Sequence, residues 1–151
     1  MDFVCSKCGK RVSTRTMQPK CDCGGLWDLD FVPPQFSPED IDRDEWSIFR
    51  YRKFMALSGE AWRQVSLGEG MTSVIPLTQN VFLKMDYFMP TLSYKDRGAA
   101  VLMAHCKELG VKQVVQDSSG NAGNSIAAYA ARAGIGCEIF GPDRHDSGPW
   151  G

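Results

Sequence analysis

Apolar and polar side chains alternate most regularly between residues 81 and 140. Five runs there carry the period of a strand or of an amphipathic helix: VFLKM (81–85), DRGAAVLMAHCKEL (96–109), KQVVQ (112–116), NAGNSIAAYAARA (121–133) and CEIF (137–140). The first, third and fifth runs predict strands, and the other two predict helices. Strands that alternate with helices pair in parallel through right-handed crossovers. This region therefore predicts an α/β fold built on a parallel sheet.

Both predicted helices carry apolar side chains along one face. In the first helix this face holds Leu102, Cys106 and Leu109. In the second helix it holds four residues: Ile126, Tyr129, Ala130 and Ala133. Cys106 and Cys137, on a helix face and in a strand, are predicted to be core residues. His105, in the middle of a helix, is predicted to pack or to face solvent rather than to catalyse.

The pattern divides the chain into four parts. They are a cysteine-rich module (1–30), a linker with a helix (31–65), the α/β region (66–142) and a tail without periodicity (143–151). In the linker, FVPPQFSPEDIDRDEW has three prolines and five acids, which is typical of a loop, and IFRYRKFMAL predicts a helix that ends at Gly59. We expect the tail to fray.

Composition places the chain among globular proteins. Of its 151 residues, 43% are hydrophobic and 23% are charged. The formal net charge of -1 gives no reason to expect a nucleic-acid or membrane partner, and no apolar run approaches the ~20 residues that span a bilayer. The N-terminal MDFVCSKCGK has neither the apolar core nor the cleavage site of a signal peptide. We therefore expect a cytoplasmic protein.

Four of the six cysteines lie between residues 5 and 23, as the pairs Cys5–Cys8 and Cys21–Cys23, each followed by glycine. Four thiolates at this spacing would close a tetrahedron around one structural zinc ion, and the lack of an export signal favours metal over disulfides. The alternative is a set of free thiols in a disordered N-terminus. Nucleic-acid binding by such a module is not favoured, because residues 1–30 carry five basic and four acidic side chains.

Two turns of the α/β region carry polar side chains suited to carbonyl chemistry. Lys95 lies beside Tyr94 in TLSYKDRGAA (91–100), between a predicted strand and a predicted helix. The loop DSSGNAGNS (117–125) also joins a strand to a helix, and its amides and hydroxyls suit a carboxylate or phosphate. Because parallel strands end at one edge of a sheet, we expect both turns at that edge and Lys95 partly buried there. A lysine amine in this setting indicates Schiff-base chemistry with an aldehyde cofactor such as pyridoxal phosphate. The alternatives are a solvated surface lysine and a plain helix cap.

Four stretches, in one order, resemble the N-terminal half of threonine synthase and its relatives among the fold type II pyridoxal-phosphate enzymes. They are SLGEGMTSV, FLKMD, MPTLSYKDRGAA and QDSSGNAGNSIAAYAARAGIGCEIFGP. The cysteine-rich module resembles the N-terminal extension of many threonine synthases. The resemblance implies a parallel-sheet fragment of such an enzyme behind a small zinc-ribbon-like module. It also implies a pyridoxal-phosphate-dependent carbon–oxygen lyase that converts O-phosphohomoserine, a small amino-acid substrate, to threonine and phosphate.

The same resemblance implies roles for individual residues. Lys95 would hold pyridoxal phosphate as a Schiff base and later transfer a proton. Asn121 would contact the 3′-oxygen of the cofactor. Ser118, Ser119 and Ala122 would line the loop that binds the substrate carboxylate.

One position departs from the family pattern, and two neighbours of Lys95 allow two interpretations. The family usually has glycine where this chain has Leu92, which would make the turn less open. Asp96 and Arg97 would either orient the turn or form an ordinary capping pair at the start of the helix.

The resemblance also implies parts that this sequence lacks. No glycine-dense run that would hold the cofactor phosphate follows Gly123, and family members are more than twice as long, so we expect a fragment that is inactive alone. A serine/threonine dehydratase or a related lyase is one alternative, and a non-catalytic zinc-ribbon interaction module is another. Three strands leave sheet edges unpaired and apolar surface exposed, so we also expect a homo-oligomer.

Overall fold

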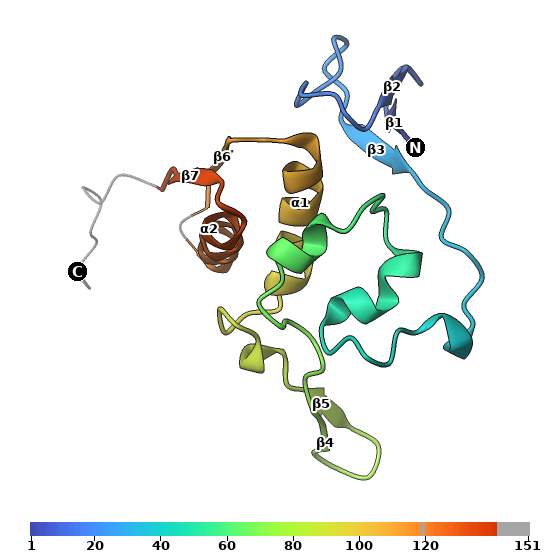
Figure 1. Ribbon diagram of the computed structural model, residues 1–151, viewed down its shortest axis with the longest axis vertical. Helices are drawn as coiled ribbons and strands as arrows, with labels where there is room; N and C mark the ends of the chain where they lie inside the picture. Colours follow the sequence, from blue (N-terminus) through green and yellow to red (C-terminus); the bar gives the residue numbers. More distant parts are fainter. Residues whose placement is uncertain (119, 142–151) are drawn as a thin grey trace.

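The computed structural model describes residues 1–118 and 120–141. Along the chain these residues form a small antiparallel sheet, an irregular connection, a hairpin, and two packed helices with a parallel strand pair (Figure 1). The tail over residues 143–151 and the loop residue Ser119 lie outside the described residues. Every helix in the described part of the chain is too short or too polar to cross a membrane.

The N-terminal sheet contains β1 (Asp2–Cys5), β2 (Arg11–Ser13) and β3 (Trp27–Asp30). Its order is β2-β1-β3, and both pairings are antiparallel. The turn between β1 and β2 includes Gly9, whose φ of 72° favours glycine. A three-stranded sheet this short buries little apolar surface, so its stability needs another source.

The connection after β3 is made of short 3₁₀ helices at Pro38–Asp40, Ile48–Phe54 and Ala61–Gln64. The prediction of a regular helix at the second of these positions is wrong. Two 3₁₀ turns meet there at Tyr51, whose φ and ψ of -102° and 17° are not helical, and Met55 is extended. Ile48 and Phe49 are buried, and Phe49 stacks on Trp62 with ring centroids 5.1 Å apart. Packing of these two side chains into the core, rather than the helical period, sets the backbone path.

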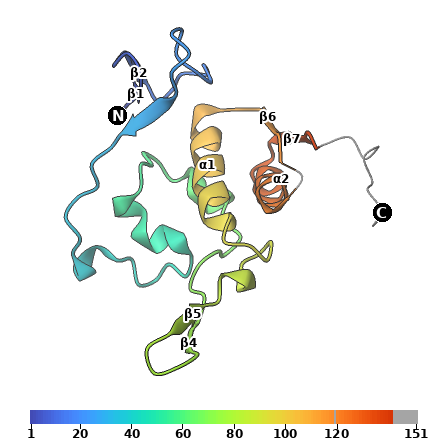
Figure 2. The same cartoon turned by 180° about the vertical axis from the view of Figure 1, so that it is seen from behind.

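A hairpin follows, made of β4 (Val74–Pro76) and β5 (Phe82–Lys84) in antiparallel pairing. The predicted strand at residues 81–85 is confirmed, but its place in a parallel sheet is wrong. The Leu77 amide donates to the Val81 carbonyl, so a short turn returns β5 to the segment just before it in sequence. In Figures 1 and 2 the hairpin projects away from the helices.

The remaining elements form a helix–strand–helix–strand unit. They are α1 (Asp96–Leu109), β6 (Gln113–Gln116), α2 (Asn121–Ala133) and β7 (Gly136–Ile139). All four are confirmed to within one residue of the predicted bounds. β6 and β7 pair in parallel, so the predicted parallel pairing is confirmed for these two strands. Each helix ends at a left-handed glycine, Gly110 (φ 74°) or Gly134 (φ 68°), whose amide donates back to the last turn.

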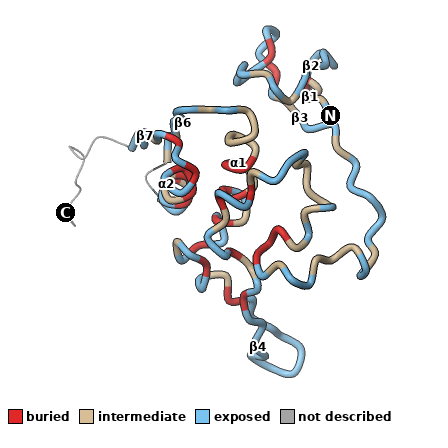
Figure 3. The backbone as a smooth tube through the Cα atoms, in the orientation of Figure 1, coloured by how far each residue is buried: buried red, intermediate tan, exposed pale blue. Residues whose placement is uncertain are grey.

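The core lies where α1 packs against α2 and the 3₁₀ segments (Figure 3). The predicted face of α2 is buried there, and the partly buried Cys106 and Cys137 pack against the core. The face of α1 that is buried differs from the stripe of Leu102, Cys106 and Leu109. It consists of smaller or more flexible side chains: Ala99, Ala100, Met103 and Ala104. Alanines let the two helix backbones approach closely, which leaves the larger Leu102 49% exposed.

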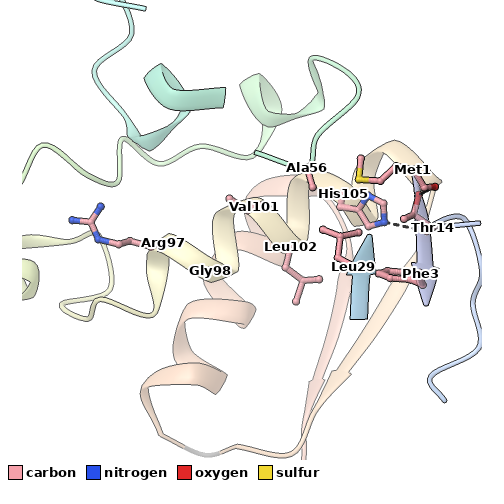
Figure 4. A pocket seen from close by; sticks show the side chains of 10 residues that line it. All are labelled: Met1, Phe3, Thr14, Leu29, Ala56, Arg97, Gly98, Val101, Leu102 and His105. Carbon is pink, nitrogen blue, oxygen red and sulfur yellow. Dashed lines mark hydrogen bonds between the residues drawn. The ribbon is translucent and has the colours of Figure 1, made fainter. Parts of the chain in front are cut away.

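The N-terminal sheet lies beside the face of α1 that carries Leu102 and His105 (Figure 4). Nε2 of His105 lies 3.2 Å from the carbonyl oxygen of Thr14. A cavity of about 320 Å³ beside this contact is lined mainly by apolar side chains, among them Phe3, Leu29 and Leu102. His105 therefore packs between the two units, in line with its predicted role.

Glu69 is an acidic residue buried in the core. Its Oε2 accepts hydrogen bonds of 2.9 Å from the Tyr129 hydroxyl and 2.9 Å from the Leu67 amide, and the Ser66 hydroxyl donates to Oε1 over 3.2 Å. Burial raises the pKa of Glu69 above its ordinary 4.5, and the Leu67 amide opposes the shift. Glu69 lies between Gly68 and Gly70 in the turn before the hairpin, and its carboxylate thus joins this turn to α2.

Replacing Glu69 with glutamine is expected to flatten the pH dependence of stability above pH 4.5. Because the folded-state pKa is raised, the unfolded chain loses this proton first. The free energy of unfolding therefore falls as the pH rises from 4.5 through the raised value. Glutamine has no such proton. Urea unfolding over a pH series checks the result, with the exposed Glu39→Gln as the control; parallel curves for wild type and Glu69→Gln would contradict it.

Candidate functional site

Lys95 directly precedes α1, at the end of the turn that begins at Thr91. The buried Ser93 hydroxyl accepts a 3.3 Å hydrogen bond from the Lys95 amide. The expected burial of the lysine side chain is wrong: it is exposed, and its Nζ lies 4.9 Å from the centroid of the Tyr94 ring. Within the described residues this amine has no ion-pair partner. It is therefore accessible to an incoming carbonyl carbon.

The residue after Lys95 is a fully buried aspartate, Asp96. Its Oδ2 accepts a 2.7 Å hydrogen bond from the Thr91 amide, and its Oδ1 accepts one from the Thr91 hydroxyl. The Ser125 hydroxyl of α2 also donates to Oδ1, over 2.6 Å, and lies 2.9 Å from the Thr91 hydroxyl. One carboxylate thus joins the turn that carries Lys95 to the second helix.

Arg97, the next residue, pairs with Asp86. Its Nε donates to Oδ2 over 3.1 Å and its Nη2 to Oδ1 over 2.9 Å, and the Thr72 hydroxyl donates to Oδ1 over 2.6 Å. The Arg97 guanidinium, with the Thr72 hydroxyl, lowers the pKa of Asp86 from 3.8 to about 2. Asp96 and Arg97 therefore hold the start of α1 to α2 and to the segment after the hairpin. This favours the orienting interpretation over an ordinary capping pair.

The loop between β6 and α2 carries the residues predicted to bind cofactor and substrate. Ser118 is partly buried, Asn121 is exposed and begins α2, and Ala122 is partly buried. The loop packs closely on the helix: a Cβ added to Gly123 would lie 1.7 Å from the Ser118 carbonyl oxygen. The amides at the start of α2 have no acceptors within the helix, which suits an anionic group.

The contact between Asp96 and Ser125 brings the start of α1 to the first turns of α2, and with it the two predicted turns. The prediction that both turns follow strands of one parallel sheet holds for the loop, which follows β6. It is wrong for Lys95, which follows the hairpin and a 3₁₀ turn at Asp86–Phe88. A helix–helix contact, rather than a shared sheet edge, joins them.

Leu92, where the resemblance leads us to expect glycine, occupies a left-handed position with a φ of 61°. A leucine there costs about 1–2 kcal/mol, because its Cβ crowds the following carbonyl oxygen. Its side chain is 74% exposed, so little packing offsets this cost. The departure from the family pattern is therefore a strained residue in the turn before Lys95.

Replacing Leu92 with glycine is expected to raise the free energy of unfolding by about 0.5–1 kcal/mol. The relieved strain exceeds the extra freedom that glycine gives the unfolded chain, about 0.4–1 kcal/mol. Urea unfolding measures the change. Leu77→Gly is the matched control, because Leu77 is also exposed but has no positive φ, and it should lower stability. Equal losses in both variants would show that the turn is unstrained.

The second candidate site is the cysteine cluster. The Sγ atoms of Cys5, Cys8, Cys21 and Cys23 all lie within 4.8 Å of one another. The Cys5–Cys23 sulfurs are 3.4 Å apart and the Cys8–Cys21 sulfurs 3.7 Å. Sulfurs about 2.3 Å from one zinc ion, at the corners of a tetrahedron, would be about 3.8 Å apart. The donor set and its spacing therefore fit a four-coordinate metal.

Glycine and backbone amides shape this cluster. A Cβ added to Gly25 would lie 2.5 Å from Sγ of Cys5. The Cys8 amide lowers the pKa of Cys5 from 9.0 to about 6. The Gly25 amide likewise lowers the pKa of Cys23. The hydrogen bonds between Cys23 and the thiols of Cys5 and Cys8 oppose this effect and prevail, so the pKa of Cys23 is raised from 9.0 to about 12. Because a thiolate rather than a thiol is the metal ligand, Cys23, whose pKa is raised, would lose its proton on binding a metal ion.

Comparison with known proteins identifies the family. The family model described as pyridoxal-phosphate dependent enzyme matches residues 65–148, which is more than half of the chain. The chain belongs to this family. Pyridoxal phosphate is therefore the cofactor that its family membership implies. Residues 1–37, which include the cysteine cluster, match the model for the zinc finger domain of DNA polymerase-epsilon.

Curated relatives of this pyridoxal-phosphate family member are threonine synthases. The Methanocaldococcus jannaschii enzyme is 32% identical over 92% of this chain and 37% of its own length. Those of Halalkalibacterium halodurans and Synechocystis are 35% and 37% identical over 62% and 64% of this chain. The matching part of the chain thus spans 37%, 28% and 27% of the lengths of these three relatives. No solved structure matches it.

Sequence reasoning missed the buried and partly buried polar residues that hold the site together. Thr91, Glu69 and Ser125 make the contacts described above, yet none was singled out as functional. Ser125 had a recognisable signal, because it is a hydroxyl residue beside Ile126 on the apolar face of a predicted helix. A polar side chain at such a position needs a buried partner.

Proposed function

We propose that this chain carries the lysine-bearing part of a pyridoxal-phosphate-dependent enzyme of threonine-synthase type. Such an enzyme would convert O-phosphohomoserine and one water molecule to threonine and phosphate, with the water supplying the new hydroxyl of threonine. The observation that carries the proposal is the exposed amine of Lys95, which directly precedes α1. The first residue of that helix, Asp96, accepts a hydrogen bond from Ser125 of α2. The threonine synthase relatives support the choice of substrate.

Each residue of the site has a proposed task. Bound pyridoxal phosphate would supply an electron sink for negative charge on the substrate carbon. Lys95 would bind the aldehyde carbon of the cofactor through Nζ. Afterwards the same Nζ would accept and donate a proton. Asn121 would donate a hydrogen bond to the ring oxygen of the cofactor. Ser118, Ser119 and Ala122 would hold the substrate carboxylate through hydroxyl and amide groups near the start of α2.

The cysteine cluster would hold one structural zinc ion. Its four sulfur ligands would fill a tetrahedron and leave no position for substrate or water, so the metal would stabilise the N-terminal sheet rather than take part in catalysis. The proposed division of the chain is therefore a zinc-ribbon-like module at residues 1–30, a linker at 31–65 and a cofactor-binding region at 66–142.

Reductive labelling tests the role of Lys95. A full-length protein that carries this chain and supplies the phosphate-holding run that the resemblance implies is incubated with pyridoxal phosphate, reduced with borohydride and mapped by peptide mass spectrometry. We expect Lys95 to carry most of the label and Lys95→Ala to lose it. Lys84→Ala is the matched control, because Lys84 is also exposed but its Nζ donates to the Thr72 carbonyl. A label found chiefly on Lys84 or Lys107 would overturn the assignment.

The proposed assembly is a homo-oligomer. The hairpin exposes large apolar side chains, including Val74, Phe82 and Leu83, and both of its strands have a free edge within the described residues. Such surfaces favour association. We expect sedimentation velocity at micromolar concentration to show species larger than the monomer, and Phe82→Lys to reduce them. A single sharp monomer boundary for the wild type would contradict this expectation.

A further inference from the structure

Two buried hydrogen-bonding residues and one partly buried one meet between the starts of α1 and α2. Asp96 is fully buried, and so is Ser125, the hydroxyl that it meets on α2. Thr91 completes the group through both its amide and its hydroxyl. A carboxylate buried in a helix interface is costly unless its oxygens are satisfied, and here they receive three donors.

Two members of this group, Thr91 and Asp96, lie on either side of Lys95 in the sequence and so restrain its position. Thr91 begins the turn and Asp96 follows Lys95, so their two hydrogen bonds close a ring of backbone around the lysine. The third bond, to Ser125, fixes that ring to α2, one turn beyond Asn121. The strained Leu92 lies inside the ring, so the turn needs such restraint to keep its shape.

We propose that Asp96 is a positioning residue that clamps the turn carrying Lys95 onto α2 and so sets where the lysine amine lies relative to the loop at the start of α2. The part of this statement that concerns cofactor binding rests on the proposed function. Asp96 itself touches neither cofactor nor substrate in this assignment. It acts through the Thr91 and Ser125 contacts.

Two substitution pairs separate positioning from general stability. Thr91→Val keeps the shape of the side chain but removes the hydroxyl, whereas Thr91→Ser keeps the hydroxyl. Asp96→Asn keeps one acceptor oxygen but places a donor amide against either the Thr91 amide or the two hydroxyls. We expect Asp96→Asn and Thr91→Val to behave alike, and Thr91→Ser to behave like the wild type.

The first readout needs no cofactor. Hydrogen exchange measures protection of the amides in residues 91–95, and the Thr91 amide is itself a donor to Asp96. Loss of a hydrogen bond to a charged group should speed exchange of this turn about tenfold in Asp96→Asn. Exchange within the last turns of α1 and α2 should stay unchanged, which a general loss of stability would not allow.

The second readout is the share of reductive pyridoxal-phosphate label found at Lys95, measured under conditions where circular dichroism shows the variant folded. We expect this share to fall about tenfold in Asp96→Asn and Thr91→Val and to stay at the wild-type level in Thr91→Ser. A wild type that does not label at Lys95, while Asp96→Asn still loosens the turn, would support the clamp and overturn the proposed function. Unchanged exchange at residues 91–95 in Asp96→Asn would overturn the clamp, whatever the labelling shows.

Discussion

Replacing Cys21 with serine is expected to abolish zinc binding and to unfold the N-terminal sheet, while α1 and α2 stay folded. Cys21 is one of the two buried cysteines of the cluster, and the sheet around it has only three short strands. In small modules of this kind a structural zinc ion contributes on the order of 10 kcal/mol of binding free energy, which is also folding free energy. Without it, β1 and β3 have too little apolar contact to persist.

Metal analysis and hydrogen exchange check this expectation. The wild type should hold one zinc ion per chain, and amides of β1 and β3 should lose protection in Cys21→Ser and after chelation. Cys137→Ser is the matched control, because Cys137 is a partly buried cysteine in β7 outside the cluster and should leave the zinc content unchanged. Less than about half an equivalent of metal in the wild type, with all four thiols freely titratable, would contradict a zinc site.

Replacing Gly123 with alanine is expected to lower the free energy of unfolding by about 3 kcal/mol and to displace the loop that carries Ser118 and Asn121. The added Cβ would lie 1.7 Å from the Ser118 carbonyl oxygen and 2.9 Å from its carbonyl carbon. Both atoms are backbone, so no side-chain rotation relieves the clash. The loop must move away from α2, and the proposed cofactor and substrate contacts move with it.

Gly98→Ala is a closely matched control for this substitution. Gly98 is the third residue of α1, as Gly123 is the third residue of α2. A Cβ at Gly98 meets no atom within 4 Å, so alanine should raise stability by about 0.5–1 kcal/mol through its higher helix propensity. Urea unfolding and the share of label at Lys95 are measured for both variants. Equal behaviour of the two alanines would mean that the loop does not pack on Gly123 as described.

The sequence by itself determined the elements whose signals are local. α1 and α2 begin and end where their apolar periodicity predicts, and β6 and β7 each follow one of these helices as predicted. The spacing of the cysteines likewise predicted a cluster that the structure bears out, because a few residues of turn fix the distance between paired thiols. Recognition of the family rested on short stretches of this kind.

Only the tertiary structure decided which elements became neighbours. β5 has the sequence of a strand, but the turn at Leu77–Val81 decided that it pairs with β4. The segment Ile48–Phe54 forms 3₁₀ turns instead of a regular helix, and two of its side chains are buried in the core. The buried face of α1 followed the close approach of α2 rather than the largest side chains. The clamp around Lys95 joins Asp96 to Ser125, 29 residues further along the chain. No local sequence pattern predicts such a contact. Its hydrogen bond stabilises the fold only after packing of the two helices has buried the carboxylate and the hydroxyl away from water.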